Sequence, residues 1–452
     1  MSEPLDLESV ARRAVEAAVD AGADDADAYA ERSVEREIRV YDGGVESLTD
    51  ASSRGVGVRA FAGGRWGYAY GTDLTDAGLR ELAGAAQEVA AVADPDEHAG
   101  LPDDSGSTDV GSLRSGELAG WTTERKVELA LEVERRARNH PEVTQVDQVV
   151  YADTDGEAAL SNSRGFTGSF ATSAAWAYAS AFAGEGDDLM TGLGLGIGRG
   201  PEALDPVAIG VEAGERAAAL AGARQPSSRR CPVVFDAFVA ASFLGFIGGM
   251  LSADAVQRGR SLFADREGDE IADPRLRLTD DGTAPDGLAS SPFDGEGAPR
   301  RRVPLLEGGR LVTFLFDART ARKAGRETTA SAVRSSYRTP PSVGTGNLIV
   351  EAGDRSLEEL VRAAGDGLYV TDVVGLHSGV NPVSGTFSVG ATGRLIEGGE
   401  LAAPVREITI ASDLVTMLRS VQGVGSQARW VPFGGSVQAV PLLLAEMTVS
   451  GS

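Results

Sequence analysis

Residues 37–70 read EIRVYDGGVESLTDASSRGVGVRAFAGGRWGYAY, and this stretch predicts consecutive antiparallel strands joined by tight turns. Its apolar runs end at two glycine pairs, Gly43-Gly44 and Gly63-Gly64. After the second pair, W-G-Y-A-Y at residues 66–70 alternates large and small side chains, as in a strand with one buried face. The apolar positions that mark the two earlier strands are Ile38, Val40, Val56, Val58 and Ala60.

Helical patterns flank these strands on both sides. Apolar residues recur at three- and four-residue spacing in two segments, which begin at Leu7 and Leu79. A polar stretch rich in Asp, Pro, Gly and Ser follows at residues 94–111 and is typical of a linker. We therefore expect an N-terminal α+β domain over residues 1–95.

The segment after the linker again mixes the two patterns. A helix near Thr123 is expected to end before Pro141, because proline disfavours a helical conformation in the residue that precedes it. Trp176, Tyr178, Ser180 and Phe182 alternate with alanines, so they fall on one face of a predicted strand and the alanines on the other. Pro206 suits the first position of another helix. Residues 112–224 are therefore expected to form a central domain.

Residues 230–452 are expected to form a β-rich C-terminal domain. The run L-L-E-G-G-R-L at residues 305–311 is echoed by L-I-E-G-G-E-L at residues 395–401, and paired glycines suit hairpin turns. A true internal repeat and the frequency of such hairpins explain the echo equally well. Between the two runs, Ser356 and Glu359 predict a capping box at the start of a helix. Strands outnumber helices here, so the fold class of the chain is α+β with antiparallel sheets.

No targeting or membrane segment is expected. The N-terminus is acidic and lacks a basic region followed by an apolar run, so it does not look like a signal peptide. The most apolar stretch, residues 237–253, is short for a membrane span and contains three glycines, which favours a buried helix. The single cysteine, Cys231, excludes an intrachain disulfide. We therefore expect a soluble protein of the cytoplasm.

The charge of the chain is strongly acidic. The sequence has 67 acidic and 42 basic residues, a formal net charge of −25, and only two lysines. Such a surface repels nucleic acid, because affinity for nucleic acid rests on Lys and Arg that displace counterions from the phosphates. The charge indicates adaptation to a salty cytoplasm, as in halophile proteins. A cationic partner is the alternative explanation.

Histidines are too few and too dispersed to predict a zinc site. His98, His140 and His377 are far apart, and no H-E-x-x-H is present. An oxygen-only Mg²⁺ or Ca²⁺ site stays open, because carboxylates are plentiful. The run D-T-D-G at residues 153–156 resembles the start of a calcium loop but lacks the ligands that should follow, and we interpret it as a turn.

Two further features favour structural roles. Cys231 precedes an apolar run that predicts a buried strand, which is a poor setting for a nucleophile. Glycines alternate with larger residues over positions 192–200, a spacing that phosphate-binding loops do not have. This pattern predicts a strand whose glycine face packs closely against another element.

The run G-L-H-S-G-V-N-P-V-S-G at residues 375–385 is the strongest local anomaly. Four polar side chains cluster there between two strand patterns, and all of them offer hydrogen bonds. They can contact a ligand, or they can cap the backbone of their own turn. The residues alone favour neither interpretation. The four side chains are His377, Ser378, Asn381 and Ser384.

This loop also carries a family resemblance. H-S-G-x-N-P-x-S-G-x-F-S-x-G-A, from His377 to Ala391, resembles the signature of the TldD/PmbA family, in its PmbA- or TldE-type branch. The run D-D-G-T at residues 280–283 and the run F-D-G-E-G at residues 293–297 resemble another block of this family. The resemblance covers nearly the whole chain.

The resemblance implies a metallopeptidase complex in which a TldD-type subunit binds the metal through H-E-x-x-x-H. Residues 258–264 resemble the block just downstream of that motif. Counting back without gaps places the metal-binding positions on Leu244, Gly245 and Gly249, none of which can bind a metal. The resemblance therefore implies that this chain is the metal-free partner subunit and that the metal, a zinc ion, belongs to the TldD-type chain.

The expected partners follow from the same resemblance. They are a TldD-type subunit in a heterodimer and a peptide substrate, or a second copy of the chain when it is alone, with neither nucleic acid nor membrane. His377, Ser378, Asn381 and Ser384 then become the side chains expected at the substrate cleft. Two alternatives are a regulatory or protein-binding module, as the family's older label of gyrase modulator suggests, and a hydrolase with an atypical site around His377.

Overall fold

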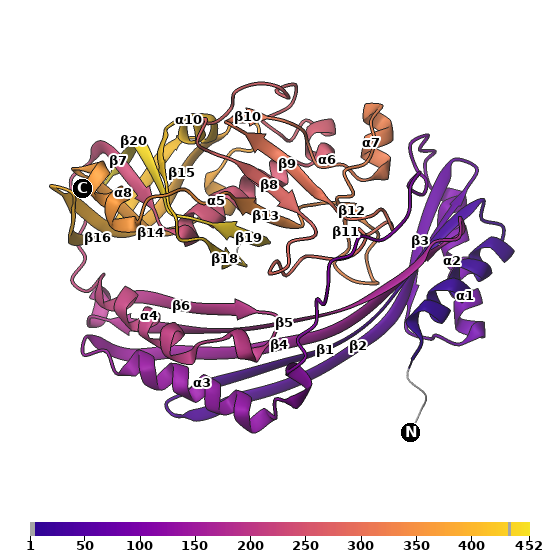
Figure 1. Cartoon of the computed structure of the whole chain (residues 1–452), viewed down its shortest axis with the longest axis horizontal. Helices are drawn as coiled ribbons and strands as arrows, with labels where there is room; N and C mark the ends of the chain where they lie inside the picture. The colour runs from indigo at the N-terminus through magenta and orange to yellow at the C-terminus, as the bar shows by residue number, and fades with distance from the viewer. Residues whose placement is uncertain (1–4, 433–434) are drawn as a thin grey trace.

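The computed structural model describes residues 5–432 and 435–452, and its N-terminal half is built on one long, curved sheet (Figure 1). This first sheet has six antiparallel strands in the order β3-β2-β1-β4-β5-β6. Because β1 pairs with β4, the two segments expected to be separate domains share this sheet. Its strands are β1 Asp25–Tyr41, β2 Gly44–Ala62, β3 Arg65–Gly71, β4 Val143–Asn162, β5 Thr167–Ala183 and β6 Met190–Gly198.

Four helices pack on one face of this sheet, the face turned away from the C-terminal half (Figure 1). A side-chain oxygen caps the first turn of each, from Asp6, Thr75, Thr122 and Asp205. The first two cover one end of the sheet and the last two cover the other end. The helices are α1 Leu7–Asp20, α2 Asp76–Val92, α3 Thr123–Arg138 and α4 Pro206–Ala218.

The glycine face of β6 confirms the packing that the alternating pattern predicts. A Cβ atom added at Gly194 would lie 1.9 Å from the carbonyl oxygen of Ile209, and one at Gly192 would lie 2.3 Å from that of Ala213. Both carbonyls belong to α4, so only glycine lets this helix lie directly on the strand.

The C-terminal half contains two six-stranded sheets with a buried helix between them. One has the order β10-β9-β8-β13-β19-β18 and the other β16-β15-β14-β7-β20-β17. Most pairings are antiparallel, but β13–β19 and β14–β7 are parallel, which the expectation of antiparallel sheets did not include. The apolar stretch forms α5, Ala237–Met250, and its side chains join both sheets in the largest core cluster.

The remaining elements of this half are short apart from one hairpin. The strands are β7 Arg229–Phe235, β8 Leu278–Asp281, β9 Arg302–Glu307, β10 Arg310–Leu311, β11 Ala332–Val333, β12 Ser342–Val343, β13 Asn347–Val350, β14 Gly367–Val374, β15 Thr386–Glu397, β16 Glu400–Asp413, β17 Val421–Val424, β18 Arg429–Val431, β19 Ser436–Ala439 and β20 Leu442–Ser450. The helices are α6 Ala253–Gln257, α7 Ala318–Ala324, α8 Leu357–Ala364, α9 Leu376–Gly379 and α10 Leu414–Arg419.

The structure confirms the predicted glycine turns and the predicted helix cap, which depend only on residues close together in the sequence. Both G-G runs form hairpin turns with positive φ at their two glycines, at β9–β10 and at β15–β16. Ser356 and Glu359 form the predicted reciprocal capping box of α8. Among the described residues, no helix combines the length and the apolar character needed to cross a membrane.

The predicted turn at residues 153–156 is wrong. These residues lie in the middle of β4, with Asp153 opposite Arg36 of β1 and Ala175 of β5. Their carboxylates are tolerated there because each meets a cation: Lys126 of α3 lies 2.7 Å from Asp153, and Arg114 lies 2.5 Å from Asp155. Long-range pairing of charges therefore overrides the local turn preference of the run.

Candidate functional site

Helix α5 carries the positions that the family resemblance aligns with a metal motif. The carboxylate of Asp236 accepts a hydrogen bond from the N–H of Phe238 at 2.9 Å and caps the helix. Leu244 is 1% exposed and packs in the core, so its side chain points away from solvent. Gly249 is exposed, with open space where a Cβ atom would be. Leu244, Gly245 and Gly249 offer no side-chain donor, so this part of the helix does not fit a metal ion.

Polar side chains of the 375–385 loop mostly bond to the loop itself. The side-chain oxygen of Asn381 accepts hydrogen bonds from the N–H groups of Val383 and Ser384, at 2.9 and 3.0 Å. The Ser384 hydroxyl lies 2.8 Å from that of Thr386, and all these residues are exposed. Asn381 and Ser384 therefore shape the turn while their surface stays open to a ligand.

His377 lies on α9, one short helical turn that begins after Gly375. Gly375 has φ +86°, a left-handed conformation that favours glycine. The N–H groups of Ser378 and Gly379 donate to the carbonyl of Gly375 at 3.1 and 2.7 Å, and the Ser378 hydroxyl bonds weakly to the same oxygen at 3.4 Å. The turn leaves the imidazole exposed.

An aromatic cluster fixes this loop to α5. The ring of Phe387, at the start of β15, lies 5.0 Å from that of Phe243, which stacks at 5.2 Å on Phe235 of β7. A Cβ atom at Gly385 would lie 3.3 Å from Leu262, in the block that resembles the family's post-motif segment. The structure thus brings together two family-like segments that are more than a hundred residues apart.

The other predicted metal or nucleophile residues do not converge. His98 lies beside Glu97 in the linker, and the Nδ1 atom of His140 accepts the N–H of Glu142 after α3. Cys231 is buried in β7, and burial raises the pKa of its thiol. Within residues 5–432 and 435–452, no group of three His, Cys, Asp or Glu side chains is arranged to hold a metal ion.

A cavity that sequence reasoning missed lies between the central segment and the C-terminal half. Its volume is about 460 Å³, and it opens between α4, the start of α5 and β14. Arg216 donates to Asp236 at 3.2 Å and to the carbonyl of Thr371 at 3.0 Å, while the Tyr369 hydroxyl donates to Asp236 at 2.8 Å. Burial and the Asp236 charge raise the pKa of Tyr369, so its hydroxyl stays a donor. None of the motifs found in the sequence marks this cavity.

A buried charge network attaches the curved sheet to the C-terminal half. Arg59 donates to Asp27 at 3.0 Å and to Glu296 at 2.8 Å, and Arg334 donates to the other oxygen of Asp27 at 3.0 Å. The side chains of Arg59, Asp27 and Glu296 are 8%, 0% and 2% exposed. Glu296 also accepts the N–H of Ala318 at 2.9 Å. The F-D-G-E-G run therefore has an interdomain structural role.

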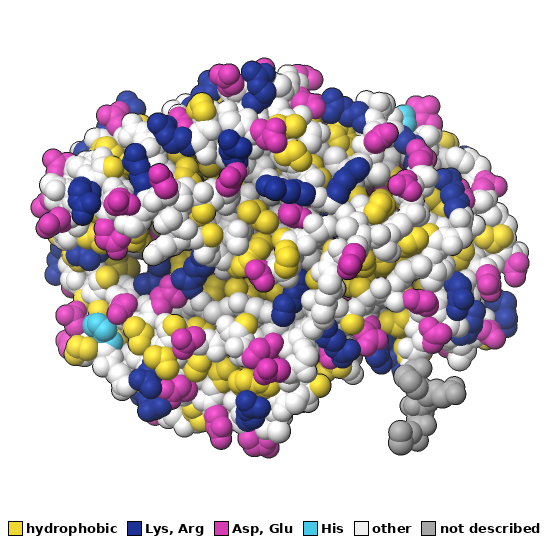
Figure 2. All heavy atoms as spheres, viewed as in Figure 1, with side chains coloured by type: hydrophobic (Ala, Val, Ile, Leu, Met, Phe, Trp, Pro, Cys, Tyr) yellow, Lys and Arg dark blue, Asp and Glu magenta, His cyan; other side chains and the backbone are white. Residues whose placement is uncertain are grey.

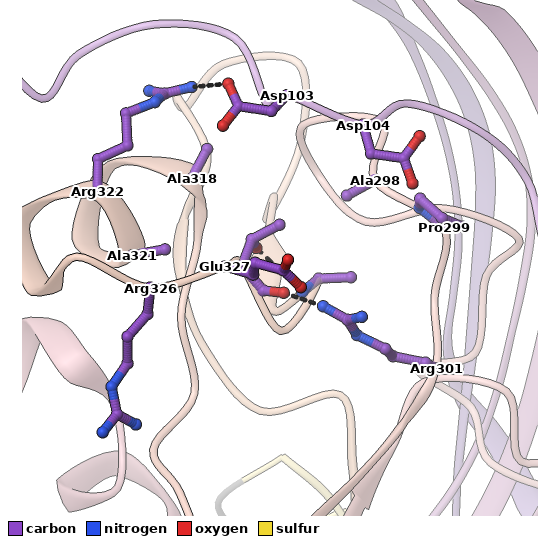
Figure 3. A pocket seen from close by; sticks show the side chains of 12 residues that line it. Asp103, Asp104, Ala298, Pro299, Arg301, Ala318, Ala321, Arg322, Arg326 and Glu327 are labelled. Atoms are coloured by element: carbon purple, nitrogen blue, oxygen red, sulfur yellow. Dashed lines mark hydrogen bonds and ion pairs between the residues drawn. The ribbon is translucent and has the colours of Figure 1, made fainter.

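A second cavity, of about 320 Å³, lies where the linker meets α7 (Figure 3). Its walls carry Arg301, Arg322 and Arg326 beside Asp103 and Asp104. Arg322 also donates to the carbonyls of His98 and Gly100, so the linker lies tightly against α7. Figure 2 shows the same mixture of acidic and basic side chains over the visible face of the molecule.

Asp280 provides a pH-dependent contribution to stability. Its side chain is 1% exposed and accepts the N–H of Gly346 at 2.7 Å. Burial raises the pKa of Asp280 to about 7, although Arg300 and the N–H of Gly346 lower it. Between about pH 4 and pH 7 the folded protein therefore binds a proton that the unfolded chain does not, and stability falls as pH rises through this window.

Asp280→Asn is expected to make the free energy of unfolding depend less on pH between about pH 4 and pH 7. The slope from Asp280 has a limit of about 1.4 kcal/mol per pH unit, because one proton is involved. Thermal unfolding of wild type and variant should be followed at intervals from pH 5 to pH 8. Asp103→Asn, at a side chain that is 88% exposed, is the control and should leave the slope unchanged. Equal slopes for wild type and Asp280→Asn would contradict the assignment.

The α+β fold and the family models that match the sequence place this chain in a class of metalloprotease-related proteins. Models of the PmbA/TldA metallopeptidase match in three parts: domain 1 at residues 26–90, the central domain at residues 116–221 and the C-terminal domain at residues 228–451. The chain belongs to the PmbA/TldA metallopeptidase family, the TldD/PmbA family that its sequence resembles.

Individual relatives agree with this assignment. Metalloprotease PmbA of Escherichia coli O157:H7 is 28% identical over 412 residues, which cover 90% of this chain and 88% of the relative. A Thermotoga maritima structure labelled a modulator of a DNA gyrase has a TM-score of 0.89 at 26% identity, covering 98% of this chain and 100% of that one. TldE from Thermococcus kodakarensis has a TM-score of 0.90 at 22% identity, covering 97% and 99%, and this likeness shows the shared fold.

Proposed function

We propose that this chain is the TldE/PmbA-type subunit of a TldD/TldE metallopeptidase complex and that it holds no catalytic metal. The observation that carries the proposal is helix α5. A catalytic zinc ion needs three protein ligands and an open position for water. Leu244 is buried in the core, and Gly245 and Gly249 have no side chain that could bind the ion.

The partner in this proposal is a TldD-type chain that carries H-E-x-x-x-H and the zinc ion. The two chains form a heterodimer in the cytoplasm that acts in peptide proteolysis or maturation. The acidic surface suits a salty cytoplasm, because like charges keep the protein soluble there. This chain contributes His377, Ser378, Asn381 and Ser384 to the substrate cleft. Their exposure, and the anchoring of their loop on α5 by Phe387, support that role.

Coexpression with a chain that contains H-E-x-x-x-H tests the proposal. An affinity tag on this chain should recover the second chain in equal amount. The purified pair should cleave a mixture of fluorogenic peptides that this chain alone does not cleave. In the control, the first His of the partner's motif is replaced by Ala, which should abolish cleavage without preventing recovery. If both chains are folded and stable but the tagged chain recovers no partner, the proposal is contradicted.

The two alternative functions give different outcomes in the same assay. A regulatory or protein-binding module would recover a partner but leave the partner's peptidase activity independent of this chain. A hydrolase centred on His377 would cleave peptides alone, and His377→Ala would abolish that cleavage. The proposed subunit differs from both, because the single chain is inactive and the pair is active.

A further inference from the structure

The cavity between α4 and β14 has walls of two kinds. Its apolar wall is formed by side chains from both halves of the molecule, Leu193, Leu220, Phe238 and Leu401. Its polar wall includes the carboxylates of Glu215 and Asp372. The cavity volume of about 460 Å³ lies within the range of small-ligand pockets, roughly 300–1,000 Å³. Such a lining suits a ligand that has an apolar body and a polar end.

A β-bulge in β14 directs Asp372 toward this cavity. Val370 and Asp372 pair with two consecutive residues of β15, so Thr371 is the extra residue of the bulge. Val370 and Val373 both pack against the largest core cluster, although regular alternation would place them on opposite faces of the strand. The bulge therefore shifts the alternation by one residue and turns Asp372 away from the core. Bulges often re-aim a side chain in this way beside a functional site.

Contacts from the central segment hold the bulge in place. Arg216 of α4 donates to the carbonyl of Thr371 at 3.0 Å, and its guanidinium lies 3.2 Å from the carboxylate of Asp236. The Thr371 hydroxyl donates to the carbonyl of Thr392 in β15 at 3.3 Å. These contacts fix the backbone next to Asp372, so the fold keeps this carboxylate at the cavity.

Two carboxylates of the cavity lack a cation partner in the part of the chain that the structure describes. Glu215 and Asp372 form no ion pair there, and the neighbouring Arg216 pairs with Asp236 instead. Arg394, the other cation of the lining, donates to carbonyl oxygens of its own β15–β16 hairpin. A carboxylate beside apolar walls is stabilised by a nearby cation. The charge that the cavity leaves unmatched is therefore negative.

Lysine and arginine side chains combine the two properties that this lining suits, because each has an apolar stem and a cationic end. The cavity is also close to the loop expected at the substrate cleft. Asp372 precedes Gly375, the first residue of the 375–385 loop, by three residues, which is about 10 Å along β14. A peptide that contacts the loop can therefore place a side chain in the cavity.

We propose that this cavity binds the side chain of a lysine or arginine residue of the peptide substrate. The stem lies against Leu193 and Phe238, and the cationic group lies at Asp372 and Glu215. The identification of the ligand as a substrate rests on the proposed function, whereas the binding of a basic side chain does not.

Peptide binding to the full chain alone tests the site. The probes are the capped peptide Gly-Leu-Lys-Leu-Gly and the same peptide with norleucine in place of lysine, which keeps the apolar stem and removes the charge. In calorimetric titrations at one fixed salt concentration, wild type should bind the lysine peptide at least about tenfold more tightly, because its cation meets carboxylates that are otherwise unpaired.

The double variant Asp372→Asn with Glu215→Gln removes both charges and nearly preserves the shape of the side chains. The preference for lysine should fall to within about twofold, while the affinity for the norleucine peptide should not change, because the apolar wall remains. Glu16→Gln, on the exposed side of α1, is the matched control and should keep the full preference. Equal affinity of wild type for the two peptides, or a folded double variant that keeps the preference, would overturn the proposal.

Photocrosslinking of wild type locates the bound side chain and does not depend on the folding of variants. A lysine peptide with benzoylphenylalanine in place of one leucine should label residues that line the cavity, such as Leu220 or Leu401, and excess unmodified lysine peptide should suppress the label. Labelling only outside the cavity would overturn the proposal. A chain that shows the preference and the labelling but recovers no TldD-type partner would contradict the proposed function and not the site.

Discussion

Arg59→Ala is expected to lower the free energy of unfolding by about 3–5 kcal/mol, because removing one partner of a buried ion pair leaves the other charge uncompensated. Here the carboxylate of Glu296, which is 2% exposed, loses the cation that it contacts, and the carboxylate of Asp27, which is 0% exposed, loses one of its two cations and keeps Arg334. Urea unfolding followed by circular dichroism measures the change. The expected loss is large because the network links the curved sheet to the C-terminal half.

The surface pair of Arg13 and Asp76 is the matched control. These side chains are 36% and 71% exposed, so Arg13→Ala should cost less than about 1 kcal/mol. If Arg59→Ala cost no more than Arg13→Ala, the network around Asp27 would not be the connection between the two halves.

Phe243→Ala is the second change with a large expected effect, a loss of about 3–5 kcal/mol in the free energy of unfolding. Phe243 is 1% exposed and contacts the rings of both Phe235 and Phe387. Its removal leaves a cavity in the largest core cluster and takes away the support under the 375–385 loop. Faster hydrogen exchange of the loop amides should accompany the loss of stability.

A substitution at the tip of the same loop serves as a control, because it changes the loop without removing core packing around Phe243. Val383 is 62% exposed, and Val383→Ala should change the free energy of unfolding by less than about 0.5 kcal/mol. Unchanged exchange in the loop of Phe243→Ala, together with a large loss of stability, would show that Phe243 supports the core but not the loop.

Much of the fold could be predicted from the sequence because local geometry decided it. The glycine pairs at residues 43–44 and 63–64 separate β1, β2 and β3, since each tight turn needs positive φ. Thr122 and Asp205 cap α3 and α4, and the alternating glycines of β6 admit α4 onto its face. In each case residues within one or two turns of the chain carry the signal.

Long-range pairing could not be predicted in the same way. β1 pairs with β4 across more than a hundred residues, and nothing in either strand specifies the other. Arg59 and Glu296 are separated by 237 positions, and only the fold shows that each neutralises the other. The run at residues 153–156 was wrongly interpreted as a turn for this reason, because Lys126 and Arg114 are remote in sequence.

The features of the candidate site also divide into those that the sequence predicted and those that required the structure. The 375–385 loop was found from its unusual run of small and polar residues, and α5 from its continuous apolar character. The packing of Phe387 on Phe243, which places the loop on α5, required the structure. The cavity beside Arg216 and Tyr369 was missed because its lining comes from segments that carry no motif.

The metal content of the purified single chain tests the central claim most directly. After incubation with a twofold excess of zinc and gel filtration, elemental analysis should find less than about 0.1 zinc per chain, because α5 offers no ligands at Leu244, Gly245 and Gly249. The TldD-type partner, treated in parallel, should retain about one zinc per chain. One tightly bound zinc in this chain alone, together with peptide cleavage that a chelator abolishes, would contradict the account.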